Sequence, residues 1–123
     1  MSLTVLVIDD SKSSRKLNLA YVHDLLGPDI TALEAPGGAQ GLDILQSRPV
    51  DVVLLDLTMP EMSGYEVLGE IQRLGLTPHI IVISADIQRR TQERVAALGA
   101  SGFLGKPVEC AALGALLDKI REA

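Results

Sequence analysis

Residues 3–11 read LTVLVIDDS, an apolar run rich in β-branched residues that ends directly in two acidic residues and a serine. A run of this length and composition predicts a β-strand, and its nearly continuous apolar character is typical of a strand that is covered on both faces. Asp9 and Asp10 would then stand at the carboxyl end of that strand. The stretch therefore predicts a buried parallel strand with polar chemistry at its end.

Similar runs recur along the chain. We predict strands at Leu3–Ile8, Ile30–Ala35, Val50–Leu55, His79–Ile83 and Ser101–Leu104, with Ile30–Ala35 as an edge strand because its apolar residues alternate. Helical spacing predicts two buried helix stripes, formed by Leu17, Ala20, Tyr21 and Leu25 and by Val67, Ile71 and Leu74. Further helices are predicted at 38–47, 87–98 and 109–121. Strands and helices thus alternate along the whole sequence.

This alternation predicts an α/β fold, a doubly wound parallel sheet with helices on both faces in three α/β/α layers. In such open sheets, ligands bind beyond the carboxyl ends of the strands. A chain of 123 residues and 13.1 kDa has the size of one domain. We therefore predict a single domain over residues 1–123, with its functional residues just after the strands.

Composition excludes several classes of protein. With 47% hydrophobic and 22% charged residues, the chain can bury a core and is not a disordered tail. A formal charge of −5 argues against direct binding to nucleic acid. No apolar run approaches the roughly 18 residues of a membrane span, so we expect a cytoplasmic protein without membrane insertion. The one cysteine, Cys110, excludes a disulfide framework, and we expect it to pack in the core with Leu113, Leu117 and Ile120.

Polar residues stand at the ends of four of the predicted strands. They are Asp9 with Asp10, Asp56, Ser84 and Lys106. Taken singly they have structural explanations, since Asp10 or Ser11 could cap the first helix and Asp56 could serve a turn. A parallel sheet, however, brings the carboxyl ends of all its strands to one edge. We therefore predict that three carboxylates, a hydroxyl and an ammonium group converge there.

Three carboxylates at one place repel each other unless a cation lies between them. An all-oxygen donor set favours a hard ion such as Mg²⁺. A carboxylate beside Mg²⁺ and a lysine can attack phosphorus and form an acyl phosphate, whose oxygens the two cations neutralise. Asp56 is the candidate nucleophile, with Lys106 and the Ser84 hydroxyl as stabilising groups.

Four motifs carry a resemblance to a known family. They are Val7–Ser11, Leu54–Gly64, Ile83–Ala85 and the stretch from Gly99 through Pro107, in this order. On these residues the chain resembles a receiver domain of the two-component response-regulator family over essentially its whole length. The resemblance implies a flavodoxin-like fold with five helices and a five-stranded sheet in the order 2-1-3-4-5.

The resemblance also implies roles for single residues. Asp56 would be the phosphoacceptor, charged from a phosphohistidine on a histidine kinase or a histidine phosphotransfer protein. Asp9 and Asp10 would bind Mg²⁺ together with Asp56 and the backbone carbonyl of Thr58.

The same resemblance implies roles for further positions. Lys106 would pair with the phosphoryl oxygens and precede a cis peptide bond to Pro107. Ser84 and Phe103 would be the switch residues. In the family, the positions of Thr58 and Asp86 tune how fast water reaches the phosphoryl group.

The implied function is a phosphorylation-dependent signalling switch that changes partner binding through the face formed by the fourth helix, fifth strand and fifth helix. Its only chemistry would be self-phosphorylation and self-dephosphorylation. We expect a stand-alone regulator of the chemotaxis type, or alternatively a receiver excised from a longer regulator or hybrid kinase. An exposed apolar patch of Ala112 and Leu116 beside Phe103 is predicted to bind a downstream protein or a second copy, as a phosphorylation-dependent homodimer.

Two alternatives come from other classes. A Mg²⁺-dependent phosphohydrolase of the haloacid dehalogenase type also uses an aspartate nucleophile, but its Asp-x-Asp motif lies near the first strand, whereas Asp56 follows the third. A flavin- or nucleotide-binding module would need a glycine-rich phosphate loop after the first strand, and this sequence has two acids there.

Overall fold

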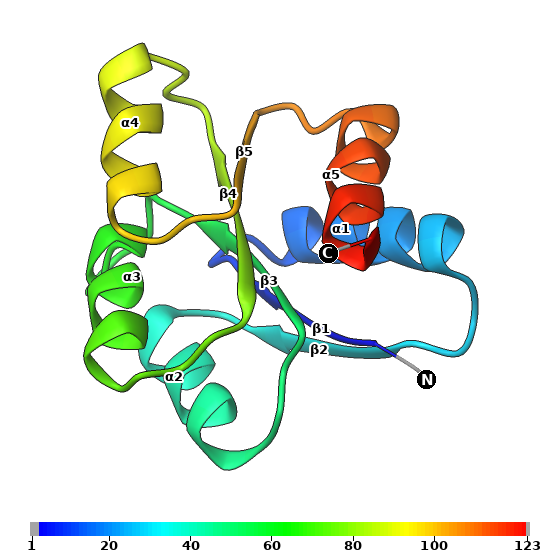
Figure 1. Ribbon diagram of the computed structural model, residues 1–123, viewed down its shortest axis with the longest axis horizontal. Helices are drawn as coiled ribbons and strands as arrows, with labels where there is room; N and C mark the ends of the chain where they lie inside the picture. The colour runs from blue at the N-terminus through cyan, green and yellow to red at the C-terminus, as the bar shows by residue number, and fades with distance from the viewer. Residues whose placement is uncertain (1–2, 123) are drawn as a thin grey trace.

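The computed structural model describes residues 3–122, so residues 1, 2 and 123 of the predicted domain lie outside the described residues. Five parallel strands form one sheet in the order β2-β1-β3-β4-β5 (Figure 1). The strands are β1 (Thr4–Ile8), β2 (Thr31–Ala35), β3 (Val52–Asp56), β4 (His79–Ser84) and β5 (Gly102–Gly105). The helices are α1 (Lys12–Leu26), α2 (Gly38–Ser47), α3 (Gly64–Arg73), α4 (Arg89–Ala97) and α5 (Cys110–Glu122). This is the flavodoxin-like fold, and it confirms the predicted strand order.

The sheet separates two apolar clusters, because successive side chains of a strand point to opposite faces. In β1, Leu6 and Ile8 join the cluster beneath α2, α3 and α4, whereas Val5 and Val7 join the cluster beneath α1 and α5. Figure 1 shows the same division, with α1 and α5 on one side of the sheet and the other helices opposite. Strands that are apolar on both faces thus hold the three layers together, as their continuous hydrophobic runs predict.

The buried face of α1 differs from the prediction. Leu17 and Ala20, both expected in the buried stripe, are exposed, while Asn18 and Val22 are the buried residues of this helix. The other two predicted residues are half-buried and pack against the α1–α5 cluster. The polar Asn18 interrupts the apolar pattern, so hydrophobic spacing alone assigned the stripe to a neighbouring face of the helix.

Helix α5 also corrects two expectations. Leu113 and Leu117 are fully buried, but Cys110 is only half-buried because it is the first residue of the helix. Leu116 packs against the α1–α5 cluster, whereas Phe103 packs with the cluster on the other face of the sheet. The predicted apolar patch of Ala112 and Leu116 beside Phe103 is therefore wrong, since the two larger side chains lie on opposite faces.

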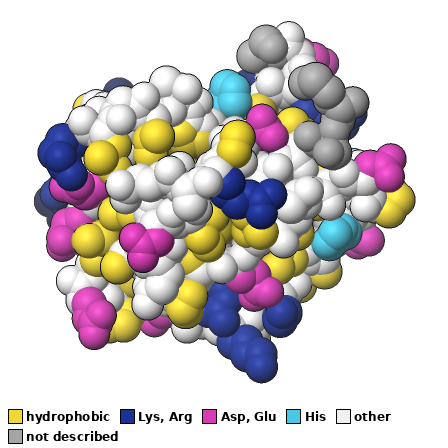
Figure 2. Space-filling view, turned by 90° about the horizontal axis from the view of Figure 1, so that it is seen from below, with side chains coloured by type: hydrophobic (Ala, Val, Ile, Leu, Met, Phe, Trp, Pro, Cys, Tyr) yellow, Lys and Arg dark blue, Asp and Glu magenta, His cyan; other side chains and the backbone are white. Residues whose placement is uncertain are grey.

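The surface carries charges of both signs. On the face shown in Figure 2, acidic and basic side chains are interspersed with small apolar areas. A basic stripe of the kind that tracks a nucleic-acid backbone is absent from the described residues of this face. Among residues 3–122, no helix combines the length and apolar character that crossing a bilayer requires.

Gly64 lets α3 begin directly against the end of β3. Its N–H donates to the carbonyl oxygen of Leu57 at 2.9 Å. A Cβ atom at this position would lie 2.6 Å from the carbonyl oxygen of Asp56 and 2.7 Å from the Cα of Leu57. Both are backbone atoms, which cannot turn away. The glycine therefore sets the close approach between α3 and the strand that carries Asp56.

We predict that Gly64→Ala lowers the free energy of unfolding by about 1–3 kcal/mol, because the added methyl group must displace backbone at the end of β3. The matched control is Gly69→Ala in the same helix, where a Cβ meets nothing within 4 Å. That change should stabilise the protein by about 0.5–1 kcal/mol through helix propensity. Urea unfolding of both variants measures the difference, and equal effects of the two substitutions would contradict this account.

Candidate functional site

Three carboxylates meet at the carboxyl edge of the sheet. Asp9 and Asp10 follow β1, and Asp56 is the last residue of the adjacent strand β3. The register pairs Ile8 with Leu55, which places Asp9 beside Asp56. One carboxylate oxygen from each of the three lies within 4.8 Å of the others. Asp9 and Asp56 are buried and Asp10 is exposed, so the cluster opens to solvent on the side of Asp10.

Lys106 supplies a positive charge to this cluster. Its Nζ lies 3.2 Å from Oδ1 of Asp56 and 3.9 Å from Oδ2 of Asp9. The backbone N–H of Lys106 donates to the carbonyl oxygen of Ser84 at 2.9 Å, which fixes the end of β5 beside β4. The peptide bond to Pro107 is cis, as the family resemblance implied.

The cluster fits a hard divalent cation. The Lys106 ammonium pairs with two of the three carboxylates, so negative charge remains in excess in the cluster. The donors are oxygen atoms, close enough to share one ion, and an exposed member leaves room for water ligands. The predicted Asp9, Asp10 and Asp56 are thus brought together as expected.

Burial changes the titration of Asp56. Loss of solvent is the main cause that raises the pKa of its carboxyl group, and the charge of Asp9 raises it further. The Lys106 ammonium and a hydrogen bond from the backbone of Thr58 lower the pKa in part. The net direction is upward, so the buried carboxylate carries an electrostatic cost that a bound cation would relieve.

The cap of α1 falls to Ser11. Its hydroxyl accepts a hydrogen bond from the N–H of Ser14 at 3.3 Å, and its own N–H donates to Oδ1 of Asp9 at 2.9 Å. Of the two predicted capping residues, Ser11 takes this role. The carboxylate of Asp10 instead stands with Asp9 and Asp56.

Ser84 lies at the end of β4 and is buried. Its Oγ accepts a hydrogen bond from the N–H of Asp86 at 3.0 Å. Ser84 and Thr58 line the same open cavity of about 280 Å³, beside Tyr65 and Asp86. The hydroxyl therefore lies at the carboxyl end of β4, the strand next to β3 and its Asp56, and its role toward Asp56 stays a prediction.

The Asp86 carboxylate is turned toward the start of α4. It accepts a hydrogen bond from the hydroxyl of Thr91 at 2.8 Å and one from the N–H of Gln88 at 3.0 Å. The Gln88 hydrogen bond, the Thr91 hydrogen bond and the charge of Arg90, in that order, lower the pKa of Asp86. The sequence analysis did not predict the orientation of the Asp86 side chain. An aspartate whose carboxylate accepts a hydrogen bond from the N–H two residues later is, however, a common turn signal.

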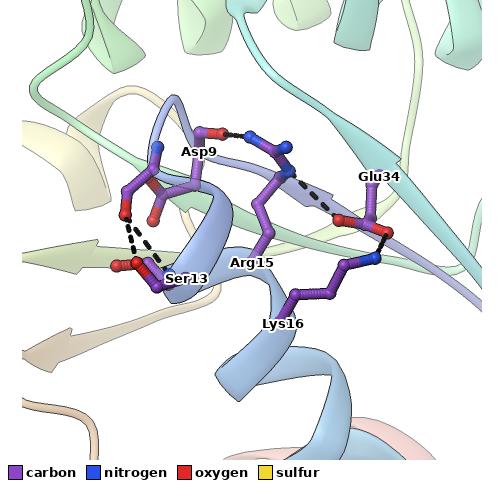
Figure 3. A network of polar contacts seen from close by, with 7 residues as sticks. Asp9, Ser13, Arg15, Lys16 and Glu34 are labelled. Atoms are coloured by element: carbon purple, nitrogen blue, oxygen red, sulfur yellow. Dashed lines mark hydrogen bonds and ion pairs between the residues drawn. The ribbon is translucent and has the colours of Figure 1, made fainter.

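Phe103 stands apart from the acidic cluster. It is half-buried on the α4 side of β5 and borders a cavity of about 220 Å³ with Gln92, Val95 and Ala96. Sequence reasoning missed a further residue near the site, Arg15, whose guanidinium reaches the carbonyl oxygen of Asp9 (Figure 3). Such a contact has no sequence signal, because it joins a side chain to backbone.

Comparison with known proteins agrees with this geometry. Residues 5–118 match the family described as the response regulator receiver domain. The chain belongs to this family. The nitrate/nitrite response regulator protein NarL of Escherichia coli K12 is 37% identical over 109 residues, which are 86% of this chain and 49% of NarL. A probable cyclic di-GMP phosphodiesterase of Vibrio cholerae is 37% identical over 107 residues, or 85% of this chain and 23% of that protein.

A solved receiver fold is closely similar. The structure of the Vibrio cholerae chemotaxis protein CheY4 superposes with a TM-score of 0.87 at 25% identity and covers 98% of this chain and 99% of that chain. The receiver domain spans less than half the length of the two curated relatives. Nothing in these comparisons supports the phosphohydrolase alternative.

We predict that Asp56→Asn raises the unfolding temperature of the metal-free protein at pH 7. The pKa of Asp56 in the folded protein lies above its ordinary value of 3.8, so its ionised form disfavours folding and stability falls as pH rises through this range. The advantage of the variant should therefore shrink as pH falls toward 3.8 and below. Thermal unfolding with a chelator present, at a series of pH values, measures it.

Asp43→Asn on the exposed face of α2 is the control, and it should leave the unfolding temperature nearly unchanged at every pH. A gain from Asp56→Asn that did not vary with pH would contradict the electrostatic explanation.

Proposed function

We propose that this chain is a phosphorylation-controlled switch in which Asp56 accepts a phosphoryl group from a phosphohistidine on a histidine kinase or phosphotransfer protein. The observation that carries the proposal is the buried carboxylate of Asp56, with Lys106 Nζ at 3.2 Å and the Asp9 and Asp10 oxygens within 4.8 Å. Membership of the receiver family and the cytoplasmic location expected from the sequence support it.

The chemistry follows from the positions of these groups. A carboxylate oxygen of Asp56 forms the bond to phosphorus while the phosphorus–nitrogen bond of the donor breaks, and the imidazole leaves with the electron pair and takes up a proton. The Lys106 ammonium is placed to neutralise a phosphoryl oxygen, and the Ser84 hydroxyl can turn to donate to another. Bound Mg²⁺, held by Asp9, Asp10, Asp56 and the Thr58 carbonyl, would supply further positive charge there.

The output is proposed to pass through α4, β5 and α5. A new charge on Asp56 would draw the Ser84 hydroxyl away from the Asp86 N–H, and Phe103 borders a cavity beneath α4 into which its ring can move. The partner on this face is a downstream protein or a second copy of the chain. We propose one receiver domain over residues 1–123. The alternative is a receiver that forms part of a longer regulator or hybrid kinase, because the curated relatives are longer than this chain.

We predict that acetyl phosphate with Mg²⁺ adds one phosphoryl group to the wild type and none to Asp56→Ala. Intact mass spectrometry measures the addition, and a chelator should abolish it. A wild type that stays unmodified, or an Asp56→Ala variant modified to the same extent, would overturn the proposed function. Steady release of phosphate from a phosphate ester would instead favour the phosphohydrolase.

The donor protein must cover the mouth of the site to bring phosphorus to Asp56. In the described part of the chain, the large hydrophobic side chains that remain exposed are Leu17, at 49%, and Ile87, at 63%. Leu17 borders a cavity of about 380 Å³ that also reaches Lys106, Pro107 and Val108. An apolar surface thus adjoins the catalytic lysine, and we assign it to the phosphohistidine donor.

We predict that Leu17→Glu slows phosphoryl transfer from a histidine kinase by at least tenfold, which is about 1.4 kcal/mol, and leaves labelling by acetyl phosphate unchanged. The small donor needs no docking surface, so the two reactions separate chemistry from recognition. Ala20→Glu, exposed on the same helix, should affect neither reaction. Rates are measured with any kinase that phosphorylates the wild type. Equal loss with both donors would show damage to the site itself.

A further inference from the structure

Arg15 connects the acidic site to the second strand of the sheet. It lies on α1, and its side chain is only 13% exposed. One guanidinium nitrogen, Nη1, donates to the backbone carbonyl oxygen of Asp9 at 2.8 Å. Nε donates to Oε1 of Glu34 on β2 at 3.1 Å. Figure 3 shows this chain of contacts from Asp9 through Arg15 to Glu34.

We propose that Arg15 is a positioning residue for the metal-binding carboxylates, and this inference rests on the proposed function. Asp9 is held by hydrogen bonds on three sides. Its N–H donates to the carbonyl oxygen of Ala35 at 3.1 Å, its carbonyl oxygen accepts from Arg15, and its Oδ1 accepts from the N–H of Ser11. Its Oδ2 lies 3.9 Å from Nζ of Lys106.

The Arg15 contact sets the orientation of the peptide unit between Asp9 and Asp10. That unit joins two of the three carboxylates, so its rotation would turn the side chains of both. A carbonyl this close to a buried site also loses its partner at a cost when the guanidinium is removed. The hydrogen bond from Arg15 therefore keeps the two oxygens that a cation needs at one place.

Glu34 holds the Arg15 side chain in place. Its Oε2 accepts from Nζ of Lys16 at 2.8 Å while Oε1 binds Arg15. The hydrogen bond from Lys16 is the first cause, and that from Arg15 a further one, that lowers the pKa of Glu34, so the group stays ionised. Glu34 pairs with Val7 in the sheet register, so the residue that binds Arg15 lies directly beside β1. Two donors at fixed angles need a guanidinium, and a lysine in its place could not make both contacts.

Electrostatics alone predicts the opposite effect on metal binding. A positive charge near three carboxylates weakens their affinity for Mg²⁺, so removing it should tighten binding. A positioning role predicts weaker binding, because the oxygens lose their shared orientation. The sign of the change in affinity thus separates the two explanations.

The experiment is a calorimetric Mg²⁺ titration of the wild type, Arg15→Met, Arg15→Lys and Lys16→Met. Loss of an outer contact to a metal ligand lowers affinity by about tenfold or more, and we expect this for Arg15→Met. Arg15→Lys keeps the charge but not the paired geometry and should also bind more weakly than the wild type. Lys16→Met removes the other positive charge that pairs with Glu34 and leaves the Arg15–Asp9 hydrogen bond in place. The Mg²⁺ affinity of this variant should therefore stay near that of the wild type.

A second readout needs no metal. In the chelator-treated protein, hydrogen exchange of the Ser11 amide, which donates to Asp9, should be faster in Arg15→Met than in Lys16→Met. Circular dichroism checks that each variant is folded. Arg15→Met that binds Mg²⁺ as tightly as the wild type or more tightly overturns the proposal, and so does an equal loss in Lys16→Met.

These results are distinguishable from failure of the proposed function. If acetyl phosphate labels the wild type while Arg15→Met binds Mg²⁺ normally, only the role of Arg15 is overturned. If Arg15→Met loses Mg²⁺ affinity although acetyl phosphate never labels the wild type, the positioning role of Arg15 is supported. The proposed role of Asp56 as phosphoacceptor is then overturned. A wild type that binds no Mg²⁺ overturns both.

Discussion

Repulsion between carboxylates at one edge of the sheet is the constraint on which this structure depends. The register of β1 and β3 forces Asp9 and Asp56 together, and the apolar side chains of both strands hold them there. Burial raises the pKa of Asp56, and the single ammonium of Lys106 offsets only part of the repulsion. The core therefore maintains an arrangement that its charges oppose. A site held in this way gains most from a ligand that brings positive charge.

The sequence predicted the parts of the fold that follow from local periodicity and from the rules for parallel sheets. Apolar runs locate the strands, and the convergence of their carboxyl ends predicts that Asp9, Asp56 and Lys106 lie together. The buried face of α1 was predicted wrongly in part. Leu17 was predicted to be buried but is exposed. The prediction failed because the buried residue beside it, Asn18, is polar and counts as a surface residue in a hydrophobic pattern.

Individual side-chain hydrogen bonds could not be predicted from hydrophobic periodicity. The hydrogen bond from Arg15 to the Asp9 carbonyl oxygen and the one from the Thr91 hydroxyl to the Asp86 carboxylate depend on the rotamers of long or polar side chains, which leave no periodic trace. The proposed positioning role of Arg15 rests on a contact of this kind. The composition of the site follows from the sequence, whereas the hydrogen bonds around it are seen only in the folded chain.

Helix α4 is held by two independent contacts, one to the end of β4 and one to α3. Asp86 joins the Ser84 hydroxyl through its N–H and the Thr91 hydroxyl through its carboxylate, so one residue links the end of β4 to the first turn of α4. Farther along, the guanidinium of Arg94 lies 3.8 Å from the centre of the Tyr65 ring on α3. If Ser84 turns toward a phosphoryl group, only the first contact is disturbed, because the second does not involve β4. The proposed switch would then move the end of α4 nearest β4 while Arg94 keeps the helix attached to α3, so α4 would pivot rather than shift as a whole.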